Sequence, residues 1–575
     1  MNRKRLIDVA SGKEKADLVL KNVYLVNTLS GEIYVTDVAV AEGHIAGIVP
    51  GYEGIVEKDC KGLYLSPGFI DGHVHLESSM VSAGEFAKAV LPHGTTTVIA
   101  DPHEISNVLG LKGIDYILKT TEKLPLNVYI MLPSCVPATN LECSGAELNA
   151  EKLAIYKDHP KVLGLGEFMN YPGVIHTFDD VMDKLNTFKN KIIDGHAPMV
   201  TGKELCAYRA AGVTSEHECT TVKEALEKLR MGMYIMLREG SATKNLRDLM
   251  PVLNKFNERF CFFSTDDRHP DDLINEGHID NMVKILVKEQ GNIVRAVRLA
   301  SKNAAEYFGL KDLGAIAPGY RADMLLVENF EEMIIKEVYK DGVLVAENGK
   351  SIFNVENERV EDVYNTVKLK DPNIEKIQIK AQKDKKYLLN VIEIIPSQIV
   401  TKHLKVKPLI NDKGFVVPDI ENDVLKFTVF ERHNNTGNVG TGFVKGLGLK
   451  EGAIGTTVSH DSHNINVIGT NDIDIMKCVK RLEEIGGGIV IVKNGKIIDE
   501  LPLPIAGLMT EDSLENISEK IKELHKKCYE MKIEIKDPFI TMAFLALPVI
   551  PDIKLTDKGL VDVTKFSFID VLEEF

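Results

Sequence analysis

Eight short apolar runs follow one another between residues 66 and 312, and each gives way to polar or charged residues before a helical stretch begins. They end in "IDGHVHLE", "TTVIADPHE", "VYIMLPSC", "LGLGEFMN", "KIIDGHAP", "GVTSEHE", "MYIMLREGS" and "FCFFSTDDRHP". Eight βα units in roughly 250 residues are what a closed (β/α)₈ barrel requires. The sequence therefore predicts an α/β fold, a (β/α)₈ TIM barrel whose strand ends meet at one mouth.

Both flanks of this segment are typical of β structure. Residues 16–48 alternate apolar and polar positions and are rich in Val and Ile. The same texture returns in "LGAIAPGYRADMLLVENF" and "IIKEVYKDGVLVAENGK", so we expect both flanks to complete one small β-sandwich domain. Further on, Gly, Asn and β-branched residues are dense, which indicates an α+β or mostly β C-terminal domain. The expected boundaries are 1–65 and 313–364 for the small β domain, 66–312 for the barrel and 365–575 for the C-terminal domain.

Composition narrows the class of protein. The chain has 575 residues and a formal net charge of −15, which repels phosphate backbones and argues against nucleic-acid binding. Its eight cysteines include no C-x-x-C pair, so reduced thiols are the default. No stretch reaches about 18 uninterrupted apolar residues, and the start lacks a signal-peptide core, so we expect no membrane partner. A cytoplasmic enzyme acting on a small molecule fits these features.

The first strand end carries two histidines at alternating positions. His73 and His75 share one face of an extended strand, because successive side chains point to opposite sides. At the C-terminal end of a barrel strand that face is the mouth, where barrel enzymes place their chemistry. An H-x-H pair alone also occurs at surface or core positions without metal, so its meaning depends on its partners.

Such partners follow at four other predicted strand ends: Glu167, His196, His217, and Asp266 or Asp267. Imidazoles and carboxylates of this kind suit Zn, Mn or Fe, and six ligands exceed what one tetrahedral ion uses. We therefore expect two metal ions that share a water of lowered pKa, which suits hydrolysis of a polarised C–N bond. Taken singly, Glu167, His196 and His217 could be helix caps or satisfied polar groups, but the placement of the complete set at strand ends argues against that interpretation.

The motifs resemble those of the amidohydrolase superfamily, and more narrowly of its adenine deaminases. The similar blocks include "PGFIDGHVHLESSM", "DPHEISNVLG", "REGSATKNL" and "STDDRHP", together with "VSHDSHNINVIGTND" and "LPLPIAGLMT" near the C-terminus. The resemblance implies hydrolytic deamination of adenine to hypoxanthine and ammonia in purine salvage, by a bridging hydroxide on a binuclear Mn or Fe(II) centre. The fourth strand end holds Glu167 where many superfamily members have a carboxylated lysine, as the adenine deaminase branch implies. The implied ligands are His73, His75, Glu167, His196, His217 and Asp266.

Other polar residues near the expected mouth are candidates for proton transfer, metal binding or support of the site. We expect Asp266 to move the proton of the attacking water, while Glu77, Glu218 or Glu239 protonates the purine ring. Glu239 could instead pair with Arg238. His103 in "DPHE" could order a loop, touch substrate or bind metal, and Asp267 is a further ligand candidate. The tail motif "SHDSHN", which contains His463, could reach the mouth, support a subunit contact in the homo-oligomer that we expect, or form a hydrogen-bonded turn.

Three alternative functions can be distinguished from adenine deamination by sequence features. Dihydroorotase, hydantoinase and N-acetylglucosamine-phosphate deacetylase share the barrel and the metal-ligand arrangement at its mouth. They would lack "ESSM", "DPHE" and the long tail in this combination. One-zinc cytidine deaminases need P-C-x-x-C, and no cysteine pair here has that spacing. A non-enzymatic scaffold predicts eroded ligands, whereas every expected ligand position is filled.

Overall fold

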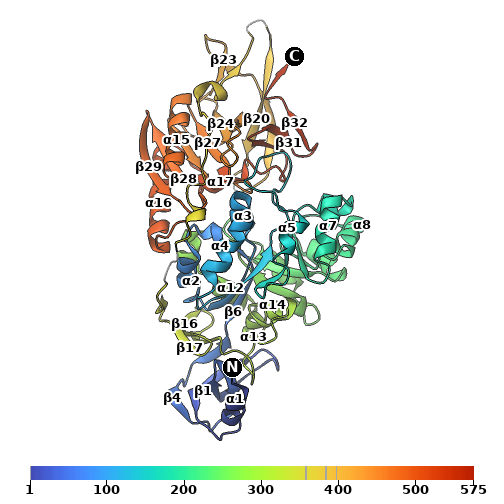
Figure 1. Ribbon diagram of the computed structural model, residues 1–575, viewed down its shortest axis with the longest axis vertical. Coiled ribbons are helices and arrows are strands. Elements are labelled where there is room, and N and C mark those ends of the chain that lie inside the picture. Colours follow the sequence, from blue (N-terminus) through green and yellow to red (C-terminus); the bar gives the residue numbers. More distant parts are fainter. Residues whose placement is uncertain (1, 356–358, 383–384, 397) are drawn as a thin grey trace.

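The structure is a computed structural model that describes residues 2–355, 359–382, 385–396 and 398–575. The molecule is elongated, with a small sheet at the end near the N-terminus, a barrel in the middle and a C-terminal region at the other end (Figure 1). None of the described helices combines the length and apolarity that crossing a bilayer requires.

The barrel is present, and all eight predicted strand ends belong to its strands. These strands are β6 (Phe69–His75), β7 (Thr95–Ala100), β8 (Asn127–Leu132), β9 (Val162–Phe168), β10 (Ile192–Gly195), β11 (Ser215–Glu216), β12 (Tyr234–Arg238) and β13 (Cys261–Ser264), continued by β14 (Asp266–Asp267). Every residue of β6 and β7 is buried, as expected for parallel strands covered on both faces. The pattern of apolar runs therefore arises because these strands have no solvent-exposed side.

Parallel pairing closes the barrel. The strands from β10 back to β6 form one sheet, and β14 pairs with β6 so that Asp266 lies opposite Val74. Strands β11 to β13 form a second run, and the amide of Thr214 donates to the carbonyl of Ile193 at 2.9 Å between the two runs. The first and eighth strands are therefore neighbours, which brings residues almost 200 positions apart to one side of the mouth.

Helices surround these strands. They are α2 (Ala83–Val90), α3 (His103–Leu109), α4 (Leu111–Thr121), α5 (Ala150–Ala154), α6 (Tyr171–Ile175), α7 (Asp179–Thr187), α8 (Gly202–Ala210), α9 (Val222–Arg230), α10 (Leu246–Leu249), α11 (Pro270–Asn275), α12 (Ile279–Gln290), α13 (Ile293–Leu299) and α14 (Lys302–Tyr307). The apolar faces of several of them join the barrel strands in one large core.

Both flanks of the barrel complete one nine-stranded sheet, packed on one side by α1 (Arg3–Ala10). Its strands are β1 (Ala16–Asn27), β2 (Glu32–Ala41), β3 (His44–Gly47), β4 (Gly54–Asp59), β5 (Tyr64–Pro67), β15 (Met324–Asn329), β16 (Ile334–Lys340), β17 (Val343–Glu347) and β18 (Lys350–Ser351). The two flanks meet where β5 pairs with β15 in antiparallel fashion. The chain thus leaves this sheet, builds the barrel and returns to it.

The C-terminal region is mostly β, and it also contains helices. Its nine-stranded sheet holds β20 (Tyr387–Ile394), β21 (Thr401–Val406), β24 (Val424–Phe430), β25 (Val439–Lys445), β26 (Ala453–Thr456), β27 (Ile465–Gly469), β28 (Gly488–Lys493), β29 (Lys496–Pro502) and β33 (Leu572–Glu574). Two three-stranded sheets are β19 (Ile379–Lys380), β22 (Leu409–Ile410) and β23 (Phe415–Val417), and β30 (Ile553–Thr556), β31 (Gly559–Asp562) and β32 (Ser567–Ile569). The helices are α15 (Asp472–Glu484), α16 (Leu514–Glu530) and α17 (Pro538–Phe544).

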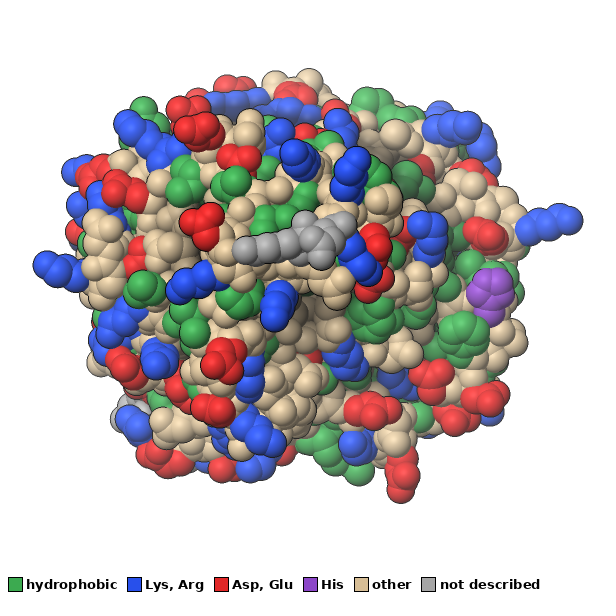
Figure 2. Space-filling model, turned by 90° about the horizontal axis from the view of Figure 1, so that it is seen from above, with side chains coloured by type: hydrophobic (Ala, Val, Ile, Leu, Met, Phe, Trp, Pro, Cys, Tyr) green, Lys and Arg blue, Asp and Glu red, His purple; other side chains and the backbone are tan. Residues whose placement is uncertain are grey.

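This region packs on the barrel at the mouth. Helix α16 packs against α11, and the loop after β8 is held by hydrogen bonds to C-terminal residues. The Cys143 amide donates to Asp557 and the Asn464 amide group donates to the Cys143 carbonyl, both at 2.8 Å. On the face at the C-terminal end of the molecule, acidic and basic side chains are interspersed rather than gathered by sign (Figure 2).

Candidate metal centre

The six predicted ligands converge at the barrel mouth. They come from the ends of β6, β9, β10, β11 and β13–β14, which the closed barrel brings around one axis. All are buried except His196, whose side chain is 25% exposed. Ligand atoms of this set, together with those of His103, form overlapping groups that could hold metal ions: His73, His75 and Asp266; His73, Glu167 and His217; and His75, His103 and Glu167.

Glu167 lies between two sets of histidines. Its Oε1 is 3.2 Å from Nε2 of His75 and 3.4 Å from Nδ1 of His103. Its Oε2 is 2.6 Å from Nδ1 of His196 and 3.3 Å from Nε2 of His217. Burial alone would raise the pKa of Glu167, but these imidazoles outweigh it and hold the pKa well below its usual range. One carboxylate thus presents one oxygen to each side of the centre.

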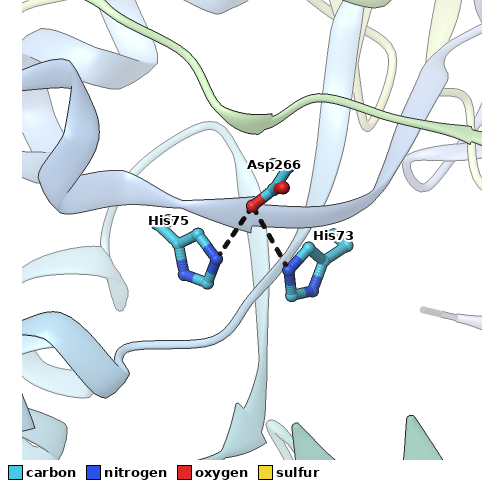
Figure 3. Close-up of side chains that lie close together, drawn as sticks. All are labelled: His73, His75 and Asp266. Atoms are coloured by element: carbon cyan, nitrogen blue, oxygen red, sulfur yellow. Dashed lines mark ion pairs between the residues drawn. The ribbon is translucent and has the colours of Figure 1, made fainter. Parts of the chain in front are cut away.

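Asp266 faces the histidines of the first strand (Figure 3). Its Oδ1 is 3.1 Å from Nε2 of His75 and 3.7 Å from Nε2 of His73. Asp266 has a φ of +61°, in the left-handed region that Asp tolerates better than most residues, so the strand is not extended here. The Asp267 carboxylate turns elsewhere and accepts a 2.5 Å hydrogen bond from the Ser78 hydroxyl. Of the two adjacent aspartates, Asp266 is the one at the centre.

The histidine nitrogens suit metal binding. Nε2 of His73 and Nε2 of His217 are buried without a hydrogen-bond partner among the described residues, which is costly unless another ligand contacts them. Nδ1 of His75 lies 2.9 Å from the Asp101 carbonyl, which can only accept, so in the neutral ring the proton sits on Nδ1 and the lone pair on Nε2 points inward. Burial and the neighbouring His217 lower the pKa of His73, which favours a neutral imidazole. This donor set fits two borderline or hard divalent cations.

Arg238 is a site residue that the sequence did not predict, although "REG" marks a strand end. It does not pair with Glu239. Its Nη1 contacts Glu218 Oε1 and lies 2.5 Å from Asp266 Oδ2. Burial would raise the pKa values of both carboxyls, but the guanidinium outweighs it and lowers them. Arg238 therefore forms ion pairs with two of the predicted acids, Glu218 and Asp266.

Two other predicted acids differ in surroundings. Glu77 is buried, accepts a hydrogen bond from the Ile105 amide at 3.0 Å, and has its Oε2 unpartnered among the described residues. Burial, with a contribution from the Glu104 carboxylate, raises the pKa of Glu77 to about 7. Glu239 is buried after β12, and burial raises its pKa, but it takes no part in the ion pairs of the centre.

The tail motif lies at the mouth. His460 Nδ1 is 2.8 Å from Glu104 Oε1, and His463 Nε2 is 2.6 Å from Glu104 Oε2. The same Oε1 is 3.7 Å from Nε2 of His103. Of the alternatives for "SHDSHN", the structure therefore supports a segment that reaches the barrel mouth.

Comparisons with known proteins agree with this architecture. Residues 64–345 match the model of the amidohydrolase family, and residues 398–567 match that of the adenine deaminase C-terminal domain. The chain is 53% identical over 569 residues to adenine deaminase 2 of Carboxydothermus hydrogenoformans, covering 99% of each chain. It is 46% identical to the adenine deaminases of Kosmotoga olearia and Dehalococcoides mccartyi, again with 99% of each chain covered. The chain therefore belongs to the adenine deaminases of the amidohydrolase family.

Proposed function

We propose that this protein hydrolyses adenine to hypoxanthine and ammonia at a binuclear metal centre in the barrel mouth. The observation that carries the proposal is the position of Glu167, with Oε1 toward His75 and Oε2 toward His196 and His217. A carboxylate placed in this way can bridge two cations. Full-length relatives named adenine deaminase support adenine as the substrate.

The proposed ligands are His73, His75, Glu167, His196, His217 and Asp266, with manganese or iron(II) as the ions. When bound, such ions lower the pKa of water enough to make a nucleophile at neutral pH. His103 is the proposed neighbour that orients Glu167, since its Nδ1 lies 3.4 Å from Oε1 of that carboxylate. Asp267 is held by Ser78 and is assigned no ligand role.

Protein groups must also move protons. Water adds its oxygen to the purine carbon that carries the amino group, and the C–N bond then breaks to release ammonia. We assign to Asp266 the proton of the attacking water and its delivery to the leaving amine. Glu218 pairs with Arg238, and Glu239 takes no part in the ion pairs of the centre, so Glu77, with its unpartnered Oε2, is the strongest of the three candidates to protonate the ring.

The test is product release by purified protein loaded with manganese or iron(II). Hypoxanthine and ammonia should form from adenine in equal amounts, whereas adenosine and dihydroorotate should give no turnover. Metal-loaded protein that leaves adenine unchanged would contradict the proposal. A homo-oligomer and a cytoplasmic location stay predictions, which light scattering and cell fractionation check.

A further inference from the structure

His460 is held in one orientation at the barrel mouth by residues from two regions of the chain. It lies in the loop between β26 and β27, and its Nδ1 contacts Glu104 on the barrel helix α3. Its ring stacks on Phe544, with centroids 4.8 Å apart and an angle of 25° between the planes. The ring face and one nitrogen are thus engaged, which leaves Nε2 as the polar atom for a ligand.

Glu104, His460 and His463 form a cluster with the composition of a metal site. The position of the proton on His463 argues against metal binding there. The Ser459 amide donates to Nδ1 of His463 at 3.1 Å, and a backbone amide is always the donor. A neutral His463 must then carry its proton on Nε2, the atom that lies 2.6 Å from Glu104. A metal would need that lone pair. We therefore interpret the cluster as a hydrogen-bonded clamp, in which His463 fixes the Glu104 carboxylate and Glu104 in turn orients His460.

A cavity of about 250 Å³ lies beside His460, between the barrel and the C-terminal region. Its wall includes Met80, Ser241 and His269 from three barrel strand ends, and Val458, His460 and Phe539 from the C-terminal region. The volume is far larger than the roughly 10–15 Å³ that one water needs on the same measure. The wall mixes apolar side chains with polar and charged ones, including Asp271 and Lys536, so it offers both kinds of contact to a small polar molecule.

A chain of short polar contacts links His460, in the wall of the cavity, to the candidate metal centre. Oε1 of Glu104 is 2.8 Å from Nδ1 of His460 and 3.7 Å from Nε2 of His103. The other nitrogen of His103 lies 3.4 Å from Glu167, the bridging candidate. His460 is thus separated from the bridging candidate by two side chains, Glu104 and His103, and lies in the wall of a cavity that can hold a small molecule.

We propose that His460 is a substrate-binding residue, supplied by the C-terminal region, which hydrogen-bonds the purine ring at the wall of this cavity. This inference rests on the proposed function and adds a specificity residue to it. His463, which is fully buried and does not line the cavity, is assigned the role of a positioning residue that acts through Glu104.

The test uses the full-length, metal-loaded protein with His460→Gln and His460→Phe. The phenylalanine variant keeps an aromatic ring against Phe544, so it reports on the lost nitrogen if the glutamine variant folds poorly. The matched control is His403→Gln, a histidine of the same region whose Nε2 contacts Asn390 away from the mouth. Measurements are hypoxanthine binding by calorimetry, KM and kcat for adenine, metal content and melting temperature.

Loss of a hydrogen bond to a buried heterocycle should weaken hypoxanthine binding about tenfold to a hundredfold and raise KM, with metal content unchanged. His403→Gln should match the wild type. Wild-type turnover together with unaltered KM and binding in both His460 variants would overturn this inference alone. Wild-type protein that carries metal yet neither binds nor deaminates purines would overturn the proposed function as well. If the wild type binds a third metal ion and His463→Gln loses it, the cluster of Glu104, His460 and His463 is a metal site and its assignment as a clamp is wrong.

Discussion

Arg238 and Asp266 form a buried ion pair at the barrel mouth, with Nη1 of the arginine 2.5 Å from Oδ2 of the aspartate. The other oxygen of Asp266 lies 3.1 Å from His75. Arg238 also contacts Glu218, so one guanidinium holds carboxylates from two different strand ends. Its removal would leave the buried Asp266 and the half-buried Glu218 without their cation.

Arg238→Met is therefore expected to lower both stability and activity. Removing one partner of a buried ion pair costs about 3–5 kcal/mol, and loss of an outer-shell partner costs about 10–100-fold in metal affinity or activity. The measurements are melting temperature, bound metal and turnover. The control is Arg481→Met, which breaks part-exposed ion pairs with Glu484 and Glu500. Loss of such pairs should lower the free energy of unfolding by about 1 kcal/mol or less. Equal effects of the two substitutions would contradict this view of Arg238.

Glu167→Ala should abolish turnover and lower bound metal. No other described side chain faces both His75 and His196, so neither ion would keep its full ligand set. The protein is prepared with manganese, and metal per chain is measured by mass spectrometry beside the rate. Glu151→Ala, an exposed position on α5, serves as the control and should change neither quantity. Full metal content with full activity in Glu167→Ala would refute the proposed bridge.

Much of the barrel could be predicted from sequence because its strands are buried on both sides. Such strands appear as continuous apolar runs, and the polar residue that ends each run marks the mouth. Glu167 and His217 could thus be identified one by one as strand-end residues. Their mutual distances depend on barrel closure, which the pairing of β14 with β6 provides.

The contacts that escaped prediction join residues distant in sequence or depend on one backbone angle. Arg238 pairs with Glu218 and Asp266, on the neighbouring strands, although Glu239 is its neighbour in sequence. Glu104 meets His460 more than 350 positions along the chain. The alternation of an extended strand suggested opposite directions for Asp266 and Asp267, but it could not give the left-handed φ of Asp266.

The two adjacent aspartates should differ sharply when each is changed to asparagine. Asp266→Asn removes the proposed proton acceptor and weakens a ligand, so turnover should fall about 10²–10⁴-fold, the range for a general acid–base group. Asp267→Asn should cost only about 1 kcal/mol of stability through its bond from Ser78. Rates and bound metal are compared in parallel. Similar, mild losses in both variants would leave Asp266 without its assigned role.

Lys554 offers a test of electrostatics away from the metal centre. Its ammonium is buried and donates to the carbonyls of Ile399 and Phe544, each at 2.9 Å. Burial lowers its pKa from 10.5 to about 7. Between these values the unfolded chain holds one more proton than the folded chain, so this group makes stability rise with pH, by at most about 1.4 kcal/mol per unit. Below pH 7 both states are protonated and the contribution is constant.

Lys554→Met should remove this dependence. The melting temperature of the wild type, measured relative to that of the variant, should therefore increase from pH 7 to pH 9 and stay level from pH 5.5 to pH 6.5. Lys385→Met, at an exposed ion pair with Glu574, is the matched control and should show no such rise, because its charge is not buried. A constant difference between wild type and Lys554→Met across both ranges would mean that Lys554 does not change protonation on folding, and that two carbonyls suffice to keep a buried ammonium charged.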